Sequence, residues 1–357
     1  MLRPIALLLL STAVAGLAQA GDTLPIRGLH VSAPKPEDMP LMMRLIEALP
    51  KEGVNTLVIE FDYQYQFTRR PEVAGPGALS RENVQAIAEA CRKAGIKLIP
   101  QINLLGHQSW GKVNGALLQA HPEFDETEGL YPDNQGIYCR SYCPLHPKVH
   151  EVVFDLIDEL MEATGADTFH AGMDEVFFLG EDGCPRCKGK DKAELFAGEV
   201  KTIHDHLAAS GRKMWMWGDR LLDGQSTGFG KWEASQNGTQ AAIRMIPKDI
   251  LLCDWHYDRA LPTAAYFAIE GFPVVTSPWR KADVAMSELD QVETVRGQAT
   301  PEVGERLQGI LATSWTPFVA FAKAYFGEPL AESTINGVES AASFKALFRQ
   351  IRLRHLN

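Results

Sequence analysis

The stretch TFHAGMDE, residues 168–175, is an apolar run of strand type that ends in two adjacent carboxylates, Asp174 and Glu175. Seven further runs of this type recur along the chain, and most are followed by amphipathic stretches. They are IRGLHVSA (26–33), TLVIEFD (56–62), KLIPQIN (97–103), KMWMWGD (213–219), ILLCDWHY (250–257), PVVTSP (273–278) and GILATSW (309–315). Eight strands separated by helical stretches predict a (β/α)8 fold, the TIM barrel.

Two of the intervening stretches show the helical pattern clearly. Residues 80–95 and 147–165 carry apolar residues at helical spacing, and each stretch ends at a glycine. The irregular segments 104–146 and 220–249 are then expected as long loops after the third and fifth strands. An open doubly wound sheet is the alternative fold, but the first strand runs into HVSAPKPEDMP, with prolines instead of a glycine-rich nucleotide-binding turn.

The N-terminus predicts export. Residues 1–20 join one arginine, a short apolar run and an A-x-A end, which is typical of a secretory signal peptide cleaved after Ala20. A membrane anchor is the alternative, although the run is short and lacks a charged stop-transfer flank. We therefore expect residues 21–357 to form one barrel domain in the periplasm or outside the cell, without membrane attachment.

The charge balance argues against polyanionic partners. The chain has 35 Lys and Arg against 45 Asp and Glu, a net charge of −10, and no basic cluster. Binding to nucleic acid rests largely on basic side chains that neutralise phosphates. We expect no nucleic-acid partner, and neutral or cationic substrates fit the composition better.

Polar and aromatic residues collect where the predicted strands end. In a (β/α)8 barrel these ends converge on one mouth, which holds the catalytic groups. The residues at or just beyond them are Asp62, His107, Asp174, Glu175, Trp217, Asp219, Trp255, Trp279 and Trp315. Taken singly, a tryptophan packs in a core and an acid caps a helix. Taken together, they predict an aromatic-walled acidic pocket, in which a pyranose ring could stack on indoles and bond carboxylates.

The adjacency of Asp174 and Glu175 limits the mechanism. Neighbouring side chains on a strand point to opposite faces, so both acids can reach the mouth only where the strand gives way to a loop. A glycosidase with two catalytic carboxylates needs them at least ~5 Å apart, across the scissile bond. Adjacent acids better suit a mechanism in which one protonates the leaving oxygen and the other binds a group of the substrate.

The segment HAGMDE (170–175) resembles the H-x-G-G-D-E signature of glycoside hydrolase family 20, the β-N-acetylhexosaminidases, except for Met173 at the second glycine. KLIPQINLLGH, MWMWGD, the region of Trp255 and GILATSW resemble the family's third, fifth, sixth and eighth strands. HVSAPK and GVNTLVIEFDY look closest to the hexosaminidase-D-like branch. The resemblance implies an exo-acting hydrolase that removes terminal β-linked N-acetylhexosamine, GlcNAc or GalNAc, from a glycan. It also implies substrate-assisted retention without a cofactor.

The resemblance also implies residue roles. Glu175 would be the general acid and then base, and Asp174 would orient the 2-acetamido group whose carbonyl oxygen attacks C1 to give an oxazolinium. His107 would support Asp174, with Asp62 as its partner. The remaining side chains expected to bind the substrate are His170, Trp217, Asp219, Trp255, Trp279, Trp315 and Lys35, the last where many members place an arginine.

Two departures keep other functions open. Met173 replaces a glycine beside the acids, and Lys35 offers a point charge in place of a bidentate guanidinium. One alternative is a carbohydrate-binding barrel without catalytic activity. Another is a glycosidase for a different 2-acetamido sugar linkage.

Four of the six cysteines are grouped in the predicted loops after strands three and four: Cys139, Cys143, Cys184 and Cys187. These thiols predict either disulfides, which an exported protein favours, or a structural Zn²⁺ site. Cys91 and Cys253 are expected as small buried hydrophobes.

Overall fold

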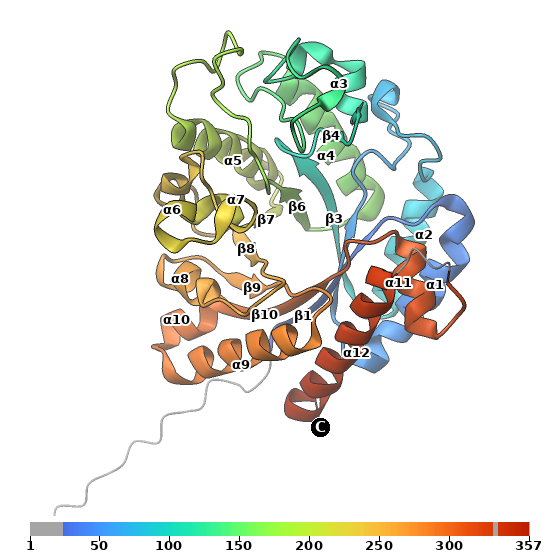
Figure 1. Ribbon diagram of the computed structural model, residues 1–357. Coiled ribbons are helices and arrows are strands. Elements are labelled where there is room, and N and C mark those ends of the chain that lie inside the picture. The colour runs from blue at the N-terminus through green and yellow to red at the C-terminus, as the bar shows by residue number, and fades with distance from the viewer. Residues whose placement is uncertain (1–23, 331–334, 357) are drawn as a thin grey trace, which may run out of the picture.

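Eight parallel strands close into a barrel in the computed structural model, which describes residues 24–330 and 335–356 (Figure 1). Around the barrel the neighbours run β1-β10-β9-β8-β7-β6-β3-β2. The strands are β1 (Ile26–Ser32), β2 (Thr56–Glu60), β3 (Lys97–Leu104), β6 (Thr168–Gly172), β7 (Lys213–Trp217), β8 (Leu251–Asp254), β9 (Val274–Thr276) and β10 (Leu307–Thr313). Each falls within or overlaps one of the eight predicted runs, so the predicted fold is confirmed. The predicted signal peptide lies outside the described residues.

Alternation along the strands separates two apolar layers. In β7, Met214 and Met216 join the core between strands and helices, whereas Trp215 and Trp217 face the barrel interior. The interior cluster consists of Val58, Ile99, Trp215, Trp217, Leu251, Cys253, Trp255, Val275 and Leu311. The barrel is therefore a packed core, and large side chains fill it up to the level of the strand ends.

Helices surround the barrel (Figure 1). They are α1 (Met39–Glu52), α2 (Arg81–Lys93), α4 (Val149–Thr164), α5 (Lys192–Ala209), α8 (Thr263–Ile269), α9 (Ala282–Gln298), α10 (Pro301–Arg306), α11 (Phe318–Phe326) and α12 (Ile335–His355). The expected helices at 80–95 and 147–165 are α2 and α4. A capping box between Ser80 and Asn83 starts α2, and left-handed Gly165 ends α4. None of the described helices is long and apolar enough to cross a bilayer.

Two long connections rise over the mouth, as expected after the third and fifth strands. The connection after β3 holds the hairpin β4 (Ser109–Trp110) and β5 (Val113–Asn114) and the short helix α3 (Ala116–Ala120). It also holds the 3-10 turns η3 (Pro122–Phe124) and η4 (Pro132–Asn134). After β7, four short pieces replace one long helix: η5 (Asp219–Leu221), α6 (Gly224–Thr227), α7 (Gly230–Glu233) and η6 (Thr239–Arg244).

Candidate active site

A tight backbone turn brings both adjacent acids to the barrel mouth. β6 ends at Gly172, and Gly172, Met173 and Glu175 have φ angles of 69°, 72° and 49°. A Cβ at residue 172 would lie 2.7 Å from Cα of Asn103, so this position needs glycine. Positive φ is uncommon for a side chain such as that of Met173. The strand therefore gives way to a loop at the acids, as their adjacency required.

His107 lies between the two carboxylates. It follows β3, and its Nε2 is 3.1 Å from Oδ2 of Asp174 and 3.3 Å from Oε2 of Glu175. Burial disfavours the charged imidazole, but the Asp174 charge and the hydrogen bonds to both acids raise the pKa of His107 well above its usual range. The site thus places one imidazole that can carry a positive charge between two carboxyl groups.

Asp174 keeps one acceptor free. Its Oδ2 bonds His107, whereas its buried Oδ1 has no hydrogen-bond partner among the described residues. Asp174 is buried, and Glu175 is partly exposed. An unpaired buried carboxylate oxygen is costly unless a ligand supplies a donor. The geometry therefore leaves a place beside Glu175 for an N–H or O–H group of a substrate.

Asp219 and Arg220 hold the backbone of the acid loop. Oδ2 of Asp219 accepts hydrogen bonds from the amide of Glu175 at 3.0 Å and from Nε of Arg220 at 2.6 Å. Trp255 Nε1 lies 3.4 Å from the other oxygen. Burial raises the pKa of Asp219 to about 6. Asp219 was predicted to bond sugar hydroxyls, but here its oxygens are engaged by protein groups. Arg220 was not predicted, although an Asp-Arg pair directly after a strand could have marked it.

The tryptophans at the strand ends form two layers. Trp217 is fully buried, with its ring centroid 4.6 Å from that of His170 and 5.3 Å from that of Trp315. It therefore forms the floor of the mouth, where a wall of the sugar pocket was expected. Trp255 stacks on Tyr257 at 5.0 Å, and Trp315 Nε1 donates to the Tyr257 hydroxyl. Tyr257, which the sequence analysis missed, joins Trp255 to Trp315.

His170 supports the turn from inside the barrel. Its Nδ1 accepts a hydrogen bond from the amide of Gly172 at 3.1 Å. Burial holds the pKa of His170 well below its usual range, so the ring is neutral. It contacts Trp217 from the strand below the acids.

Two of the residues predicted to bind the substrate, Trp279 and Lys35, make their contacts away from the acids. Trp279 packs against Tyr257, and its Nε1 donates to Ser340 of α12 at 2.7 Å, which anchors that helix. Lys35 is exposed directly before the 3-10 turn η1 (Pro36–Asp38). Within the described part of the chain, no hydrogen bond or ion pair joins Lys35 to the acids.

Asp62 belongs to a polar layer next to His107. Its Oδ1 accepts the amide of Asn103 at 2.8 Å, and the expected hydrogen bond to His107 is not formed. Asn103 also donates to Glu60 at 3.2 Å, and His30 Nε2 lies 3.4 Å from Glu60. His30 and Glu60 were not predicted. The polar residues within the runs GLHVS and VIEFD were the signal that could have found them.

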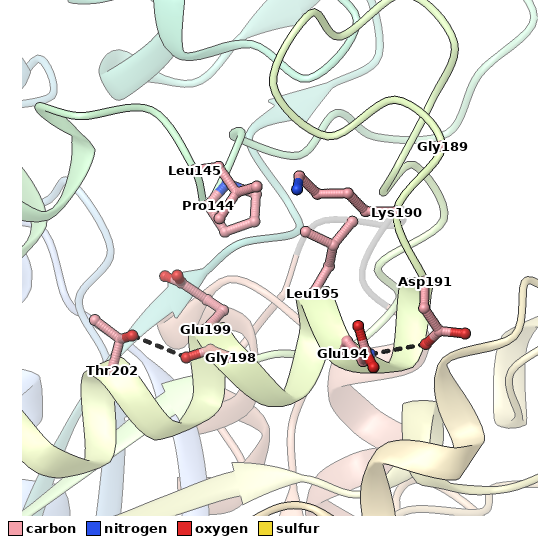
Figure 2. Close-up of a pocket in the computed structure, with 10 residues that line it drawn as sticks. All are labelled: Pro144, Leu145, Gly189, Lys190, Asp191, Glu194, Leu195, Gly198, Glu199 and Thr202. Carbon is pink, nitrogen blue, oxygen red and sulfur yellow. Dashed lines mark hydrogen bonds between the residues drawn. The ribbon is translucent and has the colours of Figure 1, made fainter.

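A pocket of about 400 Å³ opens beside His107, and its lining includes Glu60, Asp62, Tyr63, His107 and Trp110. A second pocket, of about 440 Å³, lies against α5, with Pro144 and Leu145 opposite the helix (Figure 2). Asp174 and Glu175 line neither pocket. The first pocket is joined to the two acids through His107, which lines it and contacts both carboxyl groups.

An aromatic rim, consisting of Trp110, Tyr138, Phe177 and Trp232, projects from the loops around the acids. Trp110 is 54% exposed and stacks on His107 with ring centroids 5.0 Å apart. Tyr138 contacts Trp110, Phe177 and Trp232 edge-on. Such exposed aromatic clusters mark binding surfaces more often than solvent-facing packing.

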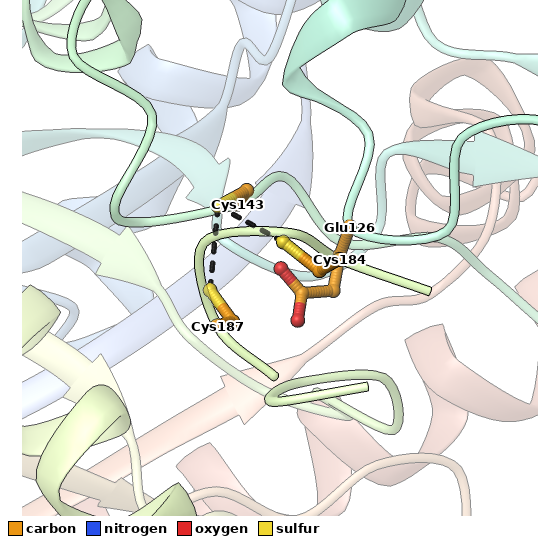
Figure 3. Close-up of side chains that lie close together, drawn as sticks. All are labelled: Glu126, Cys143, Cys184 and Cys187. Atoms are coloured by element: carbon orange, nitrogen blue, oxygen red, sulfur yellow. Dashed lines mark hydrogen bonds between the residues drawn. The ribbon is translucent and has the colours of Figure 1, made fainter. Parts of the chain in front are cut away.

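A second buried cluster, the thiol site, lies between the connection after β3 and the connection after β6 (Figure 3). It consists of Glu126, Cys143, Cys184 and Cys187, whose donor atoms all lie within 4.8 Å of one another. The structure corrects the predicted group of four cysteines, because Cys139 points elsewhere, with Sγ 3.7 Å from the carbonyl oxygen of Glu175. Cys91 and Cys253 are buried, as expected.

Comparison with known proteins identifies the family. The model of "Glycosyl hydrolase family 20, catalytic domain" matches residues 56–339. A β-hexosaminidase of Porphyromonas gingivalis is 25% identical over 211 residues, 55% of this chain and 26% of that protein. β-Hexosaminidase A of Caenorhabditis elegans is 29% identical over 169 residues, 43% of this chain and 28% of that protein. The matches thus span about a quarter of these relatives' lengths.

Solved structures share the fold. The crystal structure of a β-N-acetylhexosaminidase has a TM-score of 0.64 at 18% identity, covering 93% of this chain and 76% of that one. A Vibrio harveyi family 20 exo-β-N-acetylglucosaminidase in complex with N-acetylglucosamine has a TM-score of 0.62 at 15% identity, covering 93% and 58%. The family model covers well over half of the chain, the barrel matches, and the mouth carries the predicted acids. The chain therefore belongs to glycosyl hydrolase family 20.

Proposed function

We propose that the protein is an exo-acting β-N-acetylhexosaminidase that releases terminal GlcNAc or GalNAc from a glycan by substrate-assisted retention. The observation that carries this proposal is the free Oδ1 of Asp174 next to Glu175. The donor atoms of His107, Asp174 and Glu175 all lie within 4.8 Å of one another. Two carboxylates that acted across a scissile bond would stand at least ~5 Å apart. A nucleophile supplied by the substrate removes that requirement.

In the proposed reaction, Oδ1 of Asp174 accepts the N–H of the 2-acetamido group and orients its carbonyl oxygen towards C1. That oxygen forms a bond to C1 while the glycosidic C–O bond breaks and Glu175 gives its proton to the leaving oxygen. Glu175 then removes a proton from water, which attacks C1 of the oxazolinium and regenerates the acetamide. Two displacements at C1 retain its configuration. His107 would hold both acids in place through its contacts with Oδ2 of Asp174 and Oε2 of Glu175.

The aromatic rim supports the proposal that the leaving group is a carbohydrate. Trp110, Tyr138, Phe177 and Trp232 offer ring faces and edges around the acids, on loops that follow β3, β6 and β7. Sugar rings have apolar faces that pack on such surfaces. We propose that the rim binds the glycan beyond the bond that is cleaved.

The proposal also includes export of the protein and catalysis without a cofactor. The apolar N-terminal run and its A-x-A end support export to the periplasm or beyond the cell. Catalysis would use no cofactor, because the substrate supplies the nucleophile and Glu175 the proton. A catalytically inactive binding barrel stays the alternative, since Met173 and Lys35 depart from the family pattern.

The test is hydrolysis of 4-nitrophenyl β-GlcNAc, 4-nitrophenyl β-GalNAc and a β-linked GlcNAc oligosaccharide, a substrate with a poor leaving group, by the full chain, Asp174→Asn and Glu175→Gln. We expect Glu175→Gln to lower kcat roughly 10²–10⁴-fold on substrates with poor leaving groups. The loss should be smaller on nitrophenyl substrates, which need little protonation. Asp174→Asn should be impaired on both. Glu128→Gln, an exposed acid in the same region, is the matched control.

Two outcomes would refute the proposal. One is binding of GlcNAc by the wild-type chain without hydrolysis of either substrate. The other is an active enzyme that a thiazoline mimic of the oxazoline intermediate fails to inhibit, which would exclude substrate assistance.

A further inference from the structure

The thiol site brings four potential ligands together from three places in the sequence. Sγ of Cys143 lies 3.3 Å from Sγ of Cys187 and 3.4 Å from Sγ of Cys184. All three thiols and Glu126 are buried, with at most 1% exposure. Three mutually close thiols cannot all be paired in disulfides, because one bridge leaves the third thiol over.

The carboxylate of Glu126 also indicates a bound cation. Its Oε1 accepts hydrogen bonds from the amides of Gly180 at 2.7 Å and Glu181 at 3.1 Å. Its Oε2 is buried and has no hydrogen-bond partner in the described chain. A carboxylate buried against thiols is unfavourable unless a cation compensates it. The unpaired oxygen and the three sulfurs together make a fourfold donor set.

We propose that Glu126, Cys143, Cys184 and Cys187 bind one Zn²⁺ ion as a structural site. Thiolates select Zn²⁺ over Mg²⁺ and Ca²⁺, which require oxygen ligands. Four protein ligands complete a tetrahedral shell and leave no position for water, which distinguishes a structural zinc site from a catalytic one.

The surroundings of the sulfurs fit metal-bound thiolates. Nε of Arg186 lies 3.4 Å from Sγ of Cys143. The same guanidinium donates through Nη2 to the carbonyl oxygen of Glu123 at 3.0 Å, which holds it against the connection after β3. Hydrogen bonds of this kind orient the ligands and offset the charge of three thiolates and one carboxylate around a divalent ion.

The site would fasten the acid loop to the loop after β3. Glu126 and Cys143 belong to the connection after β3, whereas Cys184 and Cys187 follow the acids on the connection after β6. Glu126 additionally binds the backbone of that second connection at Gly180. The metal would therefore be a positioning element for the segment between Glu175 and Cys184, and the ion itself would take no part in the reaction.

The test is metal analysis of the full chain, purified without chelator or added zinc. We expect about one Zn²⁺ per chain, as for a single closed site. Thiol titration of the denatured protein, with a chelator and without reductant, should give all six cysteines as free thiols. Reconstitution with Co²⁺ should give the visible absorption of a tetrahedral cobalt thiolate.

Matched variants separate the ligands from a neighbour. Cys184→Ser, Cys187→Ser and Glu126→Gln should lose or weaken metal binding, whereas Cys139→Ser should retain one ion. Should a ligand variant fail to fold, chelation of the wild type supplies the answer: its Tm should fall and recover with Zn²⁺ but not with Mg²⁺. A metal-free wild type with four titratable thiols would overturn the proposal in favour of a disulfide. Equal loss of metal in Cys139→Ser would overturn the ligand set. These readouts are independent of hydrolysis at the mouth.

Discussion

The mouth and the thiol site both gather metal-ligand side chains within 4.8 Å, yet they are compensated differently. At the mouth, His107 supplies a positive charge between two carboxylates, and one carboxylate oxygen stays free for a substrate. At the thiol site, the guanidinium of Arg186 contacts the sulfur of Cys143 from the edge of the cluster. A cation set between two acids leaves them available for proton transfer, whereas a single guanidinium beside one of four donors leaves the thiol site suited to a metal ion.

Backbone geometry separates the two clusters as well. His107, Met173 and Glu175 all have positive φ, and so does Asp62 nearby. The four residues of the thiol site have no such angles. Strained backbone of this kind costs of order 1–3 kcal/mol per residue and persists only when the surroundings enforce it. The mouth therefore depends on its supports, which include the hydrogen bond from the amide of Glu175 to Asp219.

Removing the internal cation should have the largest effect. His107→Gln leaves two adjacent acids without their shared imidazolium, and breaking a buried charge pair costs about 3–5 kcal/mol. If this cost falls on the transition state, kcat should drop by up to roughly 10²–10⁴-fold, at 1.36 kcal/mol per factor of ten. The pKa of His107 is raised, so its deprotonation should contribute to the basic limb of the pH–kcat profile, and His107→Gln should lack that contribution.

The control for this change is His121→Gln, because His121 also pairs with two glutamates but lies in a more exposed position. It should leave kcat and the pH profile as in the wild type. A basic limb unchanged in His107→Gln would mean that His107 is only a packing residue.

Removing the metal should act on stability more than on chemistry. An ion present at about 1,000 times its Kd adds about 4 kcal/mol to the free energy of unfolding. We expect chelated wild type and Cys187→Ser to lose on the order of 10 °C in Tm, at a few degrees per kcal/mol. The kcat of the protein that remains folded should change by less than in His107→Gln. If the loss of kcat, expressed as a free energy, exceeded the loss of stability, the thiol site would act on the chemistry as the mouth does, and the two clusters would not differ in role.

The barrel could be predicted because strand ends are a property of local sequence. Runs such as TLVIEFD and KMWMWGD carry their period and their terminal acids within seven residues. The acid pair was likewise local, since its adjacency already demanded a break in the strand at Gly172. Features that depend only on chain order and residue type could therefore be predicted from the sequence.

Contacts between distant loops could not be predicted in the same way. Glu126 lies 17 residues before Cys143 in an irregular connection, and nothing in its neighbourhood marks it as the partner of thiols. Cys139, which carries the right chemistry, turns towards Glu175 instead. Tyr257 was not predicted because the sequence pattern was interpreted from the tryptophans at the strand ends. Side-chain direction in loops is set by tertiary packing, which one sequence alone does not reveal.

Glu60 offers a pH-dependent test of the charge balance at the mouth. Burial, and then the charge of Asp174, raise the pKa of Glu60 to about 7. A raised pKa contributes stability that is fully present below the unfolded value of 4.5 and is lost as pH rises through about 7. The loss amounts to at most about 3 kcal/mol. Neighbouring His30, whose pKa burial lowers to about 4, stays neutral in this window.

We therefore expect the Tm of the wild type to fall between pH 5 and pH 8 relative to that of Glu60→Gln. The amide keeps the shape of the side chain but cannot ionise. It also removes the charge that, after burial, raises the pKa of Asp62, so the curve of the variant should be flatter still. Parallel Tm curves for the two proteins would show that Glu60 is already ionised throughout, and that the mouth carries more negative charge than its buried setting suggests.

The smallest effect is expected at the aromatic rim, where contacts are partly solvated. Trp232 is 40% exposed and packs on Tyr138 and Phe177. An aromatic contact of this type contributes about 0.5–1.5 kcal/mol, so Trp232→Ala should raise KM for a β-linked GlcNAc oligosaccharide by roughly two- to tenfold. The increase should exceed that for 4-nitrophenyl β-GlcNAc, whose leaving group is short. Tyr266→Ala, an equally exposed aromatic on α8, should change neither value. Equal increases on both substrates would place Trp232 at the cleaved sugar, and the rim would then belong to the mouth itself.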